Sequence, residues 1–175
     1  MAYLLDSDVL ITASRGAYGF AICPGFWKWI DIAHSRGEVM SISDVLDELV
    51  GMEDELSAWA KARPDFWLPP TTEAVAAQSQ LYQWAVSSQH YNEKAKRGFQ
   101  QGADAALVAR ASVNNHIVVT HETATNEEGR IKIPIAAAEV GVRTMTPFAM
   151  LRHEDVRFDL AQPSGGQTSL FGGDQ

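Results

Sequence analysis

The sequence is poor in cysteine and contains no long apolar run. Its 175 residues include one cysteine, Cys23, so the chain can form neither an internal disulfide nor a cysteine-based zinc cluster. We expect Cys23 to be buried. No stretch approaches the ~18 apolar residues of a membrane span, and the first residues lack the basic charge of a signal peptide. These absences predict a cytoplasmic protein without a membrane partner.

Basic residues are also scarce, since 14 Lys and Arg face 22 Asp and Glu and leave a formal charge of −8. Phosphate contacts normally come from a basic surface, so this balance counts against a nucleic-acid partner. Two short basic groups remain: Lys94, Lys96 and Arg97, then Arg130 and Lys132. They form either a locally basic rim of a site or, as is commoner, solvated charged faces.

Apolar residues are plentiful, at 46% of a 19.2 kDa chain, which is enough for one domain with a real core. We expect this domain to span residues 1–160. The remaining residues, 161–175, are rich in Gly, Ser and Gln, and the pattern from Gln162 onward predicts a flexible tail. No internal repeat is present in the sequence.

Short apolar runs alternate with helical patterns, which predicts an α/β fold with a parallel sheet covered on both faces. The expected strands are Tyr3–Asp6, Val39–Ile42, Phe66–Leu68, Ile117–Thr120 and Val142–Met145. The expected helices are Asp8–Ser14, Phe26–Arg36, Asp44–Val50, Glu55–Ala62, Thr72–Gln89, Ala103–Asn114, one from Ile133 to near Gly141, and one from Pro147 to about Glu154. His121–Lys132 is predicted to be a loop.

Aromatic residues form two groups with helix-like spacing. These are Phe26, Trp27 and Trp29, then Trp59, Phe66 and Trp67. Helical aromatic stripes usually face apolar surface, so we predict packing in the core or at a subunit interface rather than stacking on bases.

Four acids stand where a parallel sheet would bring them together. Asp6 and Glu122 follow apolar strands, while Glu48 and Asp104 lie on helices expected to begin at the same edge. Taken singly, each has an ordinary explanation as a helix-end or solvated residue. The joint pattern predicts a shared cleft.

A shared cleft would need a counterion. Two carboxylates ~4 Å apart repel by about 4 kcal/mol at an effective dielectric of ~20. Oxygen-only ligands favour Mg²⁺ or Mn²⁺, and such ions typically activate water against a phosphoryl group. Phosphodiester hydrolysis is therefore the expected reaction.

At these residues the sequence resembles PIN-domain nucleases. The resemblance rests on four segments in the family's order: Asp6-Ser7-Asp8, V-L-D-E-L with Glu48, G-A-D-A-A-L-V-A-R-A with Asp104, and V-V-T-H-E with Glu122. It spans about Tyr3 to Met145. Within it, the chain resembles a PIN-like branch of no assigned function, DUF4411. The sequence departs from the commonest PIN pattern at Asp8, where Asn is frequent, and at His121-Glu122, where an Asp often follows Thr.

The resemblance implies a three-layer αβα fold with strand order 3-2-1-4-5. It also implies that Asp6, Glu48 and Asp104 are the core metal ligands and that Glu122 is the fourth acid. The possible supporting residues are Ser7, Asp8, Thr120 and His121, of which His121 would contact phosphate or lie plainly at the surface. The implied activity is that of a small Mg²⁺- or Mn²⁺-dependent endoribonuclease. Many PIN domains are toxins, so an antitoxin protein and a homodimer are further implied partners.

Two other functions fit parts of the pattern. A phosphatase of the haloacid dehalogenase class would use Asp6 as nucleophile and Asp8 as acid/base, but it leaves Glu48 and Asp104 without a role. A non-catalytic PIN-like module would keep the acids and serve only as a binding scaffold. Activity measurements separate these from a nuclease.

Overall fold

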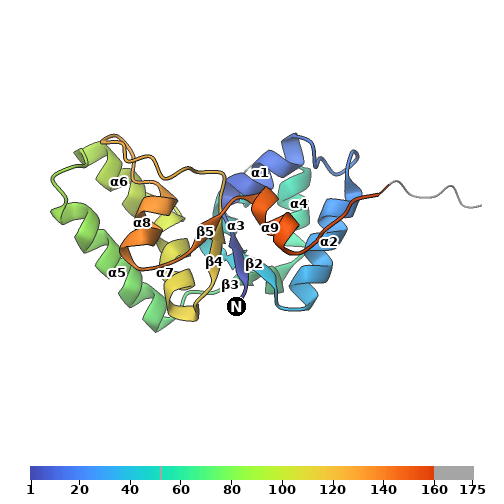
Figure 1. The fold of residues 1–175 in the computed structure, drawn as a ribbon, viewed down its shortest axis with the longest axis horizontal. Helices are drawn as coiled ribbons and strands as arrows, with labels where there is room; N and C mark the ends of the chain where they lie inside the picture. The colour runs from blue at the N-terminus through green and yellow to red at the C-terminus, as the bar shows by residue number, and fades with distance from the viewer. Residues whose placement is uncertain (52, 160–175) are drawn as a thin grey trace, which may run out of the picture.

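Five short parallel strands form the centre of the molecule, with helices on both faces (Figure 1). The structure, a computed structural model, describes residues 1–51 and 53–159. The strand order is β3-β2-β1-β4-β5, which confirms the predicted α/β class and order and is consistent with three αβα layers. The tail predicted at 161–175 lies outside the described residues. In the described part of the chain, the helices are too short or too polar to cross a membrane.

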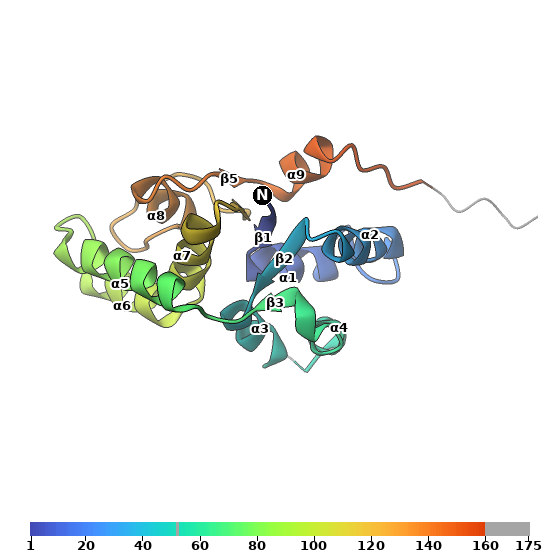
Figure 2. The ribbon, with the colours of Figure 1, turned by 90° about the horizontal axis from the view of Figure 1, so that it is seen from below.

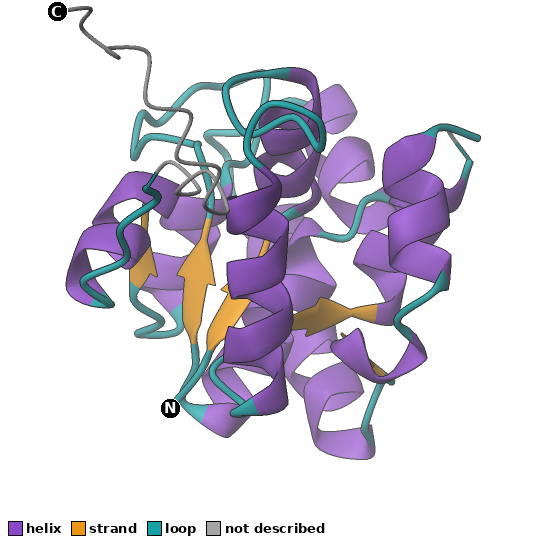
Figure 3. Cartoon of the chain, turned by 90° about the vertical axis from the view of Figure 1, so that its right-hand side faces the viewer, coloured by secondary structure: helices purple, strands orange, loops and turns teal. Residues whose placement is uncertain are grey.

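The strands are two to four residues long and lie between helices (Figure 3). They are β1 (Tyr3–Leu5), β2 (Val39–Ile42), β3 (Trp67–Leu68), β4 (Ile117–Val119) and β5 (Thr144–Met145). β1 is central and pairs in parallel with β2 on one side and with β4 on the other. Leu5 is opposite Val119 in this register, so the residues that follow β1 and β4 leave the sheet side by side.

The helices divide between the two sides of the sheet (Figures 1 and 2). They are α1 (Ser7–Arg15), α2 (Pro24–Ser35), α3 (Ser43–Val50), α4 (Glu55–Lys61), α5 (Thr72–Ser87), α6 (Glu93–Gln101), α7 (Asp104–Asn114), α8 (Ile133–Glu139) and α9 (Pro147–His153), with a 3₁₀ turn, η1, at Pro64–Phe66. On one side lie α5, α6, α7 and α8, and on the other lie α1, α2, α4 and α9.

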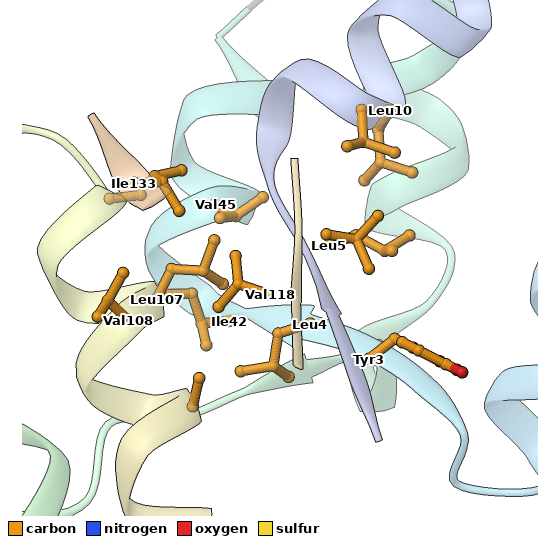
Figure 4. Close-up of a cluster of buried hydrophobic side chains, with 14 of the residues drawn as sticks. Tyr3, Leu4, Leu5, Leu10, Ile42, Val45, Leu107, Val108, Val118 and Ile133 are labelled. Carbon is orange, nitrogen blue, oxygen red and sulfur yellow. The ribbon is translucent and has the colours of Figure 1, made fainter. Parts of the chain in front are cut away.

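Both faces of β1 are buried, which explains why it reads as an uninterrupted apolar run. Leu4 points toward Leu107 of α7, whereas Tyr3 and Leu5 point to the opposite face (Figure 4). Successive side chains of a strand alternate between faces, so each face of the sheet receives its own layer of core. This packing anchors the carboxyl end of β1, from which Asp6 emerges.

Local signals set the ends of several helices. Side chains of Asp54, Thr71, Asn92 and Thr146 accept hydrogen bonds from the backbone N–H three residues on, which caps α4, α5, α6 and α9. Asn115 ends α7 in a left-handed conformation, with a φ of 52°. The chain then enters β4 directly.

Five of the six residues in the two aromatic groups are buried in the core, as predicted, and Trp29 is half-buried against it. Phe26 and Trp27 on α2 are buried, and Trp27 lies edge-on to Trp59 of α4 with ring centroids 5.0 Å apart. Phe66 and Trp67 are buried beside Trp59. Cys23, which was predicted to be buried, is half-buried against this core.

Most predicted elements are present, with shifted ends. The structure contains a helix, α6 at Glu93–Gln101, that the sequence pattern did not predict. α2 begins at Pro24 rather than Phe26, because proline suits the first helical turn. Phe66 belongs to the 3₁₀ turn, and only Trp67–Leu68 pairs with β2.

Candidate functional site

The four predicted acids leave separate elements at one edge of the sheet. Asp6 follows β1 directly, and Glu122 comes three residues after β4. Glu48 lies on α3, which follows β2, and Asp104 is the first residue of α7. The carboxyl edge of a parallel sheet is where open α/β folds place their ligands.

All four acids line a single open cleft of about 430 Å³. Its remaining lining residues are Ser7, Asp8, Gly102, His121 and Arg130. The structure therefore brings together each predicted acid and three of the four predicted supporting residues. The fourth, Thr120, is buried directly behind Asp6.

Asp6 is the most deeply placed acid, with only 6% of its surface exposed. Thr120 donates its hydroxyl hydrogen to Asp6 Oδ2 at 2.9 Å, and Ser7 donates to Oδ1 at a long 3.5 Å. Burial raises the pKa of Asp6 from its ordinary value of 3.8 to about 6, because the charged form loses water. The Thr120 hydrogen bond opposes this rise, and the nearby Glu122 and Asp8 add to it.

The pKa of Asp104 is raised further than that of Asp6, although Asp104 is less deeply buried. Burial, followed by the charges of Asp6 and Glu122, raises the pKa of Asp104 from 3.8 to about 7. The guanidinium of Arg130 opposes the rise without cancelling it. Two carboxyl groups with raised pKa values in one cleft indicate negative charge that the protein itself does not neutralise.

Glu48 is fixed by the backbone of the segment that precedes α7. Its Oε1 accepts a hydrogen bond from Ala103 N–H at 3.0 Å, and Gly102 lies beside the same oxygen. Glu48 is otherwise exposed to the cleft. This contact joins α3 to the start of α7 and brings Glu48 close to Asp104.

Both carboxylate oxygens of Glu122 have a neighbouring group that holds them. Its Oε2 accepts a hydrogen bond from Ile133 N–H at 2.7 Å, and its Oε1 lies against Arg130 Nη2 in an ion pair without hydrogen-bond geometry. Its own N–H donates to Thr120 Oγ1 at 3.1 Å. Thr120 thus connects Glu122 to Asp6 through one hydroxyl group.

The remaining predicted residues lie at the rim. Asp8 is exposed and accepts a hydrogen bond from Thr12 at 3.2 Å. His121 faces the cleft and also lines a neighbouring apolar pocket together with Phe148.

The donors fit a hard divalent cation in kind, because the cleft offers carboxylate oxygens and no sulfur. As the side chains stand, within residues 1–51 and 53–159, no three His, Cys, Asp or Glu residues are arranged to hold a metal ion. Their present contacts give the reason, since Glu48 and Glu122 point partly toward backbone N–H groups and Arg130. Binding an ion would require these side chains to turn inward.

Sequence reasoning missed the groups that hold the acids in place. The N–H groups of Ala103 and Ile133 carry no side-chain signal, because every residue except proline offers the same donor. Arg130 was noted only as part of a basic group, yet it pairs with Glu122 at the edge of the cleft.

The fold and the cleft define an α/β protein whose parallel sheet carries an acidic cleft at its carboxyl edge. The chain belongs to the family described as a domain of unknown function (DUF4411), whose family model matches residues 3–158. A comparison with curated proteins found no match. The family match covers every residue that lines the cleft.

Proposed function

We propose that this protein is a metal-dependent endoribonuclease that hydrolyses RNA phosphodiesters, as its resemblance to PIN-domain nucleases implies. The convergence of four acids from separate elements on one cleft supports this proposal most directly. Two of them have raised pKa values, which is the condition that a bound cation relieves. The expected cofactor is Mg²⁺ or Mn²⁺.

In this proposal Asp6, Glu48 and Asp104 hold the ion, and Glu122 contributes directly or through water. When bound, Mg²⁺ or Mn²⁺ polarises a phosphoryl oxygen and lowers the pKa of the attacking water. Thr120 keeps the Asp6 carboxylate in one orientation through its 2.9 Å hydrogen bond. Preorganised ligands lose less freedom when an ion or substrate binds.

The remaining polar groups position the substrate. Arg130 offers a cation at the edge of the cleft, where it can face a phosphate of the RNA. Ala103 N–H keeps Glu48 beside Asp104, so the two carboxylates come from neighbouring elements to the place where they would share one ion.

The same resemblance supports a biological role as the toxin of a toxin–antitoxin pair. Under this proposal the protein acts in the cytoplasm, an antitoxin protein restrains it, and it forms a homodimer. Expression of the wild type should then arrest growth, whereas the Asp6→Asn variant should not. Equal growth with the two proteins would contradict the toxin role while leaving the nuclease activity to be judged separately.

Cleavage of single-stranded RNA tests the nuclease proposal. Purified protein should cut RNA with Mg²⁺ or Mn²⁺ and stop on addition of EDTA. Asp6→Asn and Asp104→Asn should each lower the rate by about 100-fold or more, because each removes a ligand charge. Asp47→Asn is the matched control, since it removes the same charge from α3 at an exposed position outside the cleft. Activity that persists in both cleft variants would overturn the assignment.

The same preparation separates the two other functions. A dehalogenase-like phosphatase would hydrolyse p-nitrophenyl phosphate and leave RNA intact, with Asp6 as nucleophile and Asp8 as acid/base. Both residues line the cleft, but Glu48 and Asp104 would have no role there. A non-catalytic binding module would hydrolyse neither substrate under any metal condition.

A further inference from the structure

A second groove of about 390 Å³ adjoins the acidic cleft and has a different charge. It runs between α6 and the segment 129–131, and it shares Asp104 and Arg130 with the cleft. Lys94 and Gly98 of α6 line its other side. A ligand whose reacting group lies at the four acids can therefore extend directly into this groove.

The groove presents two cations against one acid. Lys94 is exposed there, and none of the described residues forms an ion pair or hydrogen bond with its ammonium group. The other lysines near the site are paired, Lys96 with Glu93 and Lys132 with Glu127. Arg130 pairs with Glu122 but leaves 62% of its side chain exposed.

Two of the residues that line the groove, Gly98 and Gly129, are glycines and add no side chain to it. Gly98 lies inside α6, where glycine costs about 1 kcal/mol relative to alanine. A Cβ added at Gly98 would meet no heavy atom within 4 Å, so packing does not require glycine at this position. The open backbone surface at Gly98 and Gly129 widens the groove next to Lys94.

We propose that this groove binds the phosphate adjacent to the scissile phosphodiester of a single-stranded RNA, with Lys94 and Arg130 as its cationic contacts. The proposal rests on the proposed nuclease function for the location of the scissile group. In a protein of charge −8, a polyanion needs a local cationic path to approach four carboxylates. The groove supplies that path beside Asp104.

Binding of a fluorescently labelled single-stranded RNA, measured by anisotropy in Ca²⁺ as a function of salt, tests the proposal. Lys94→Ala should weaken binding by about threefold to fivefold, as loss of one exposed ion pair does. It should also reduce the salt slope by about 0.7, the value for one phosphate contact on a single strand. Gly98→Leu should weaken binding as well, because its side chain fills the groove without changing charge.

Arg97→Ala is the matched control, since it removes the same charge from α6 outside the groove. Equal losses in Lys94→Ala and Arg97→Ala would overturn the proposal, as would absence of RNA binding by the wild type. Poly-glutamate that binds as tightly as RNA through Lys94 would also overturn it and indicate an acidic protein segment as the ligand.

Cleavage in Mn²⁺ distinguishes this proposal from the nuclease function. RNA that binds through Lys94 but is not cut supports the groove and contradicts the nuclease. RNA that is cut equally well by the wild type and Lys94→Ala supports the nuclease and contradicts the groove.

Discussion

At the scale of single residues, Thr120 connects the two acids that follow neighbouring strands. Its hydroxyl donates to Asp6 and accepts from Glu122 N–H, and it is 1% exposed. The pairing of β1 with β4 places Thr120 beside Asp6. One side chain therefore fixes a buried carboxylate and the start of the loop that carries Glu122.

Two substitutions of Thr120 can separate the contribution of its branched side-chain shape from the contribution of its hydrogen bonds. Thr120→Val keeps the branched shape but loses both hydrogen bonds, which should lower stability by about 1–3 kcal/mol because Asp6 keeps a buried oxygen without its partner. Thr120→Ser retains the hydroxyl and should preserve metal-dependent activity. Urea unfolding and cleavage rates measure the two effects. A Thr120→Val protein that matches wild type in both would show that the hydroxyl is dispensable.

The raised pKa values of Asp6 and Asp104 make stability depend on pH. Both are higher in the folded state, so the folded state binds more protons than the unfolded state between about pH 4 and pH 7. Without metal, the free energy of unfolding should therefore fall as pH rises through this window. The change attributable to Asp6 alone is on the order of 3 kcal/mol, since one pKa unit corresponds to about 1.4 kcal/mol.

Urea unfolding in EDTA at several pH values measures this dependence. Asp104→Asn should flatten the pH dependence and equal or exceed wild type in stability at neutral pH. Mg²⁺ or Mn²⁺ should raise the melting temperature of wild type more than that of the variant. If Asp104→Asn loses the same stability with and without metal, the acids do not share a cation.

At the scale of elements, α3 and α7 are joined by Glu48. The Glu48 carboxylate accepts a hydrogen bond from Ala103 N–H, and Glu48 also lines the cleft. Glu48 therefore combines a structural role and a proposed ligand role, which substitutions can separate.

Glu48→Gln keeps an oxygen acceptor for Ala103 N–H and removes the charge, so stability should change little. Glu48→Ala removes both and should cost about 1 kcal/mol. Both variants should lose most metal-dependent cleavage. Thermal melts in EDTA and cleavage rates in Mn²⁺ check these outcomes. Full activity in Glu48→Gln would restrict Glu48 to its structural role.

The elements also show which features the sequence could predict. Strands and most helices carry apolar periodicity because they pack on a core, so they were predicted to within a few residues. α6 is highly polar, and only Ala95 and Phe99 of it are buried. Its single apolar pair gives too short a pattern to predict, although Asn92 followed by Glu93 is a start signal.

In the candidate site, the acids could be predicted from the sequence, whereas the groups that hold them in place could not. The acids were predictable because each stands after a strand or near the start of a helix, positions that topology brings to one edge. The backbone donors Ala103 N–H and Ile133 N–H could not be predicted. A backbone N–H is common to every residue except proline, so its contacts leave no residue-specific signal in the sequence.

At the scale of the whole molecule, the core of the described residues is formed by apolar side chains that all precede residue 160. Its buried apolar cluster runs from Tyr3 to Leu151. Removal of residues 162–175, which are rich in Gly, Ser and Gln, should leave the melting temperature nearly unchanged, because a segment of this composition contributes little to folding. Differential scanning calorimetry of the full and shortened chains measures this. A loss of several degrees would show that Leu170 and Phe171 pack on the folded body.

The sheet order carries a consequence for engineering. Asp6 and Glu48 come before the α5–α6 connection at residues 88–92, and Asp104 and Glu122 come after it. The two segments meet where β1 pairs with β4 and where α5 packs against α7. A chain divided at Gln89 and His90, both exposed, would place half of the acids on each fragment. Neither fragment would contain the complete cleft. If each fragment were fused to one of two proteins that associate, the cleft would assemble only when those proteins bind each other, and its assembly would report on their association.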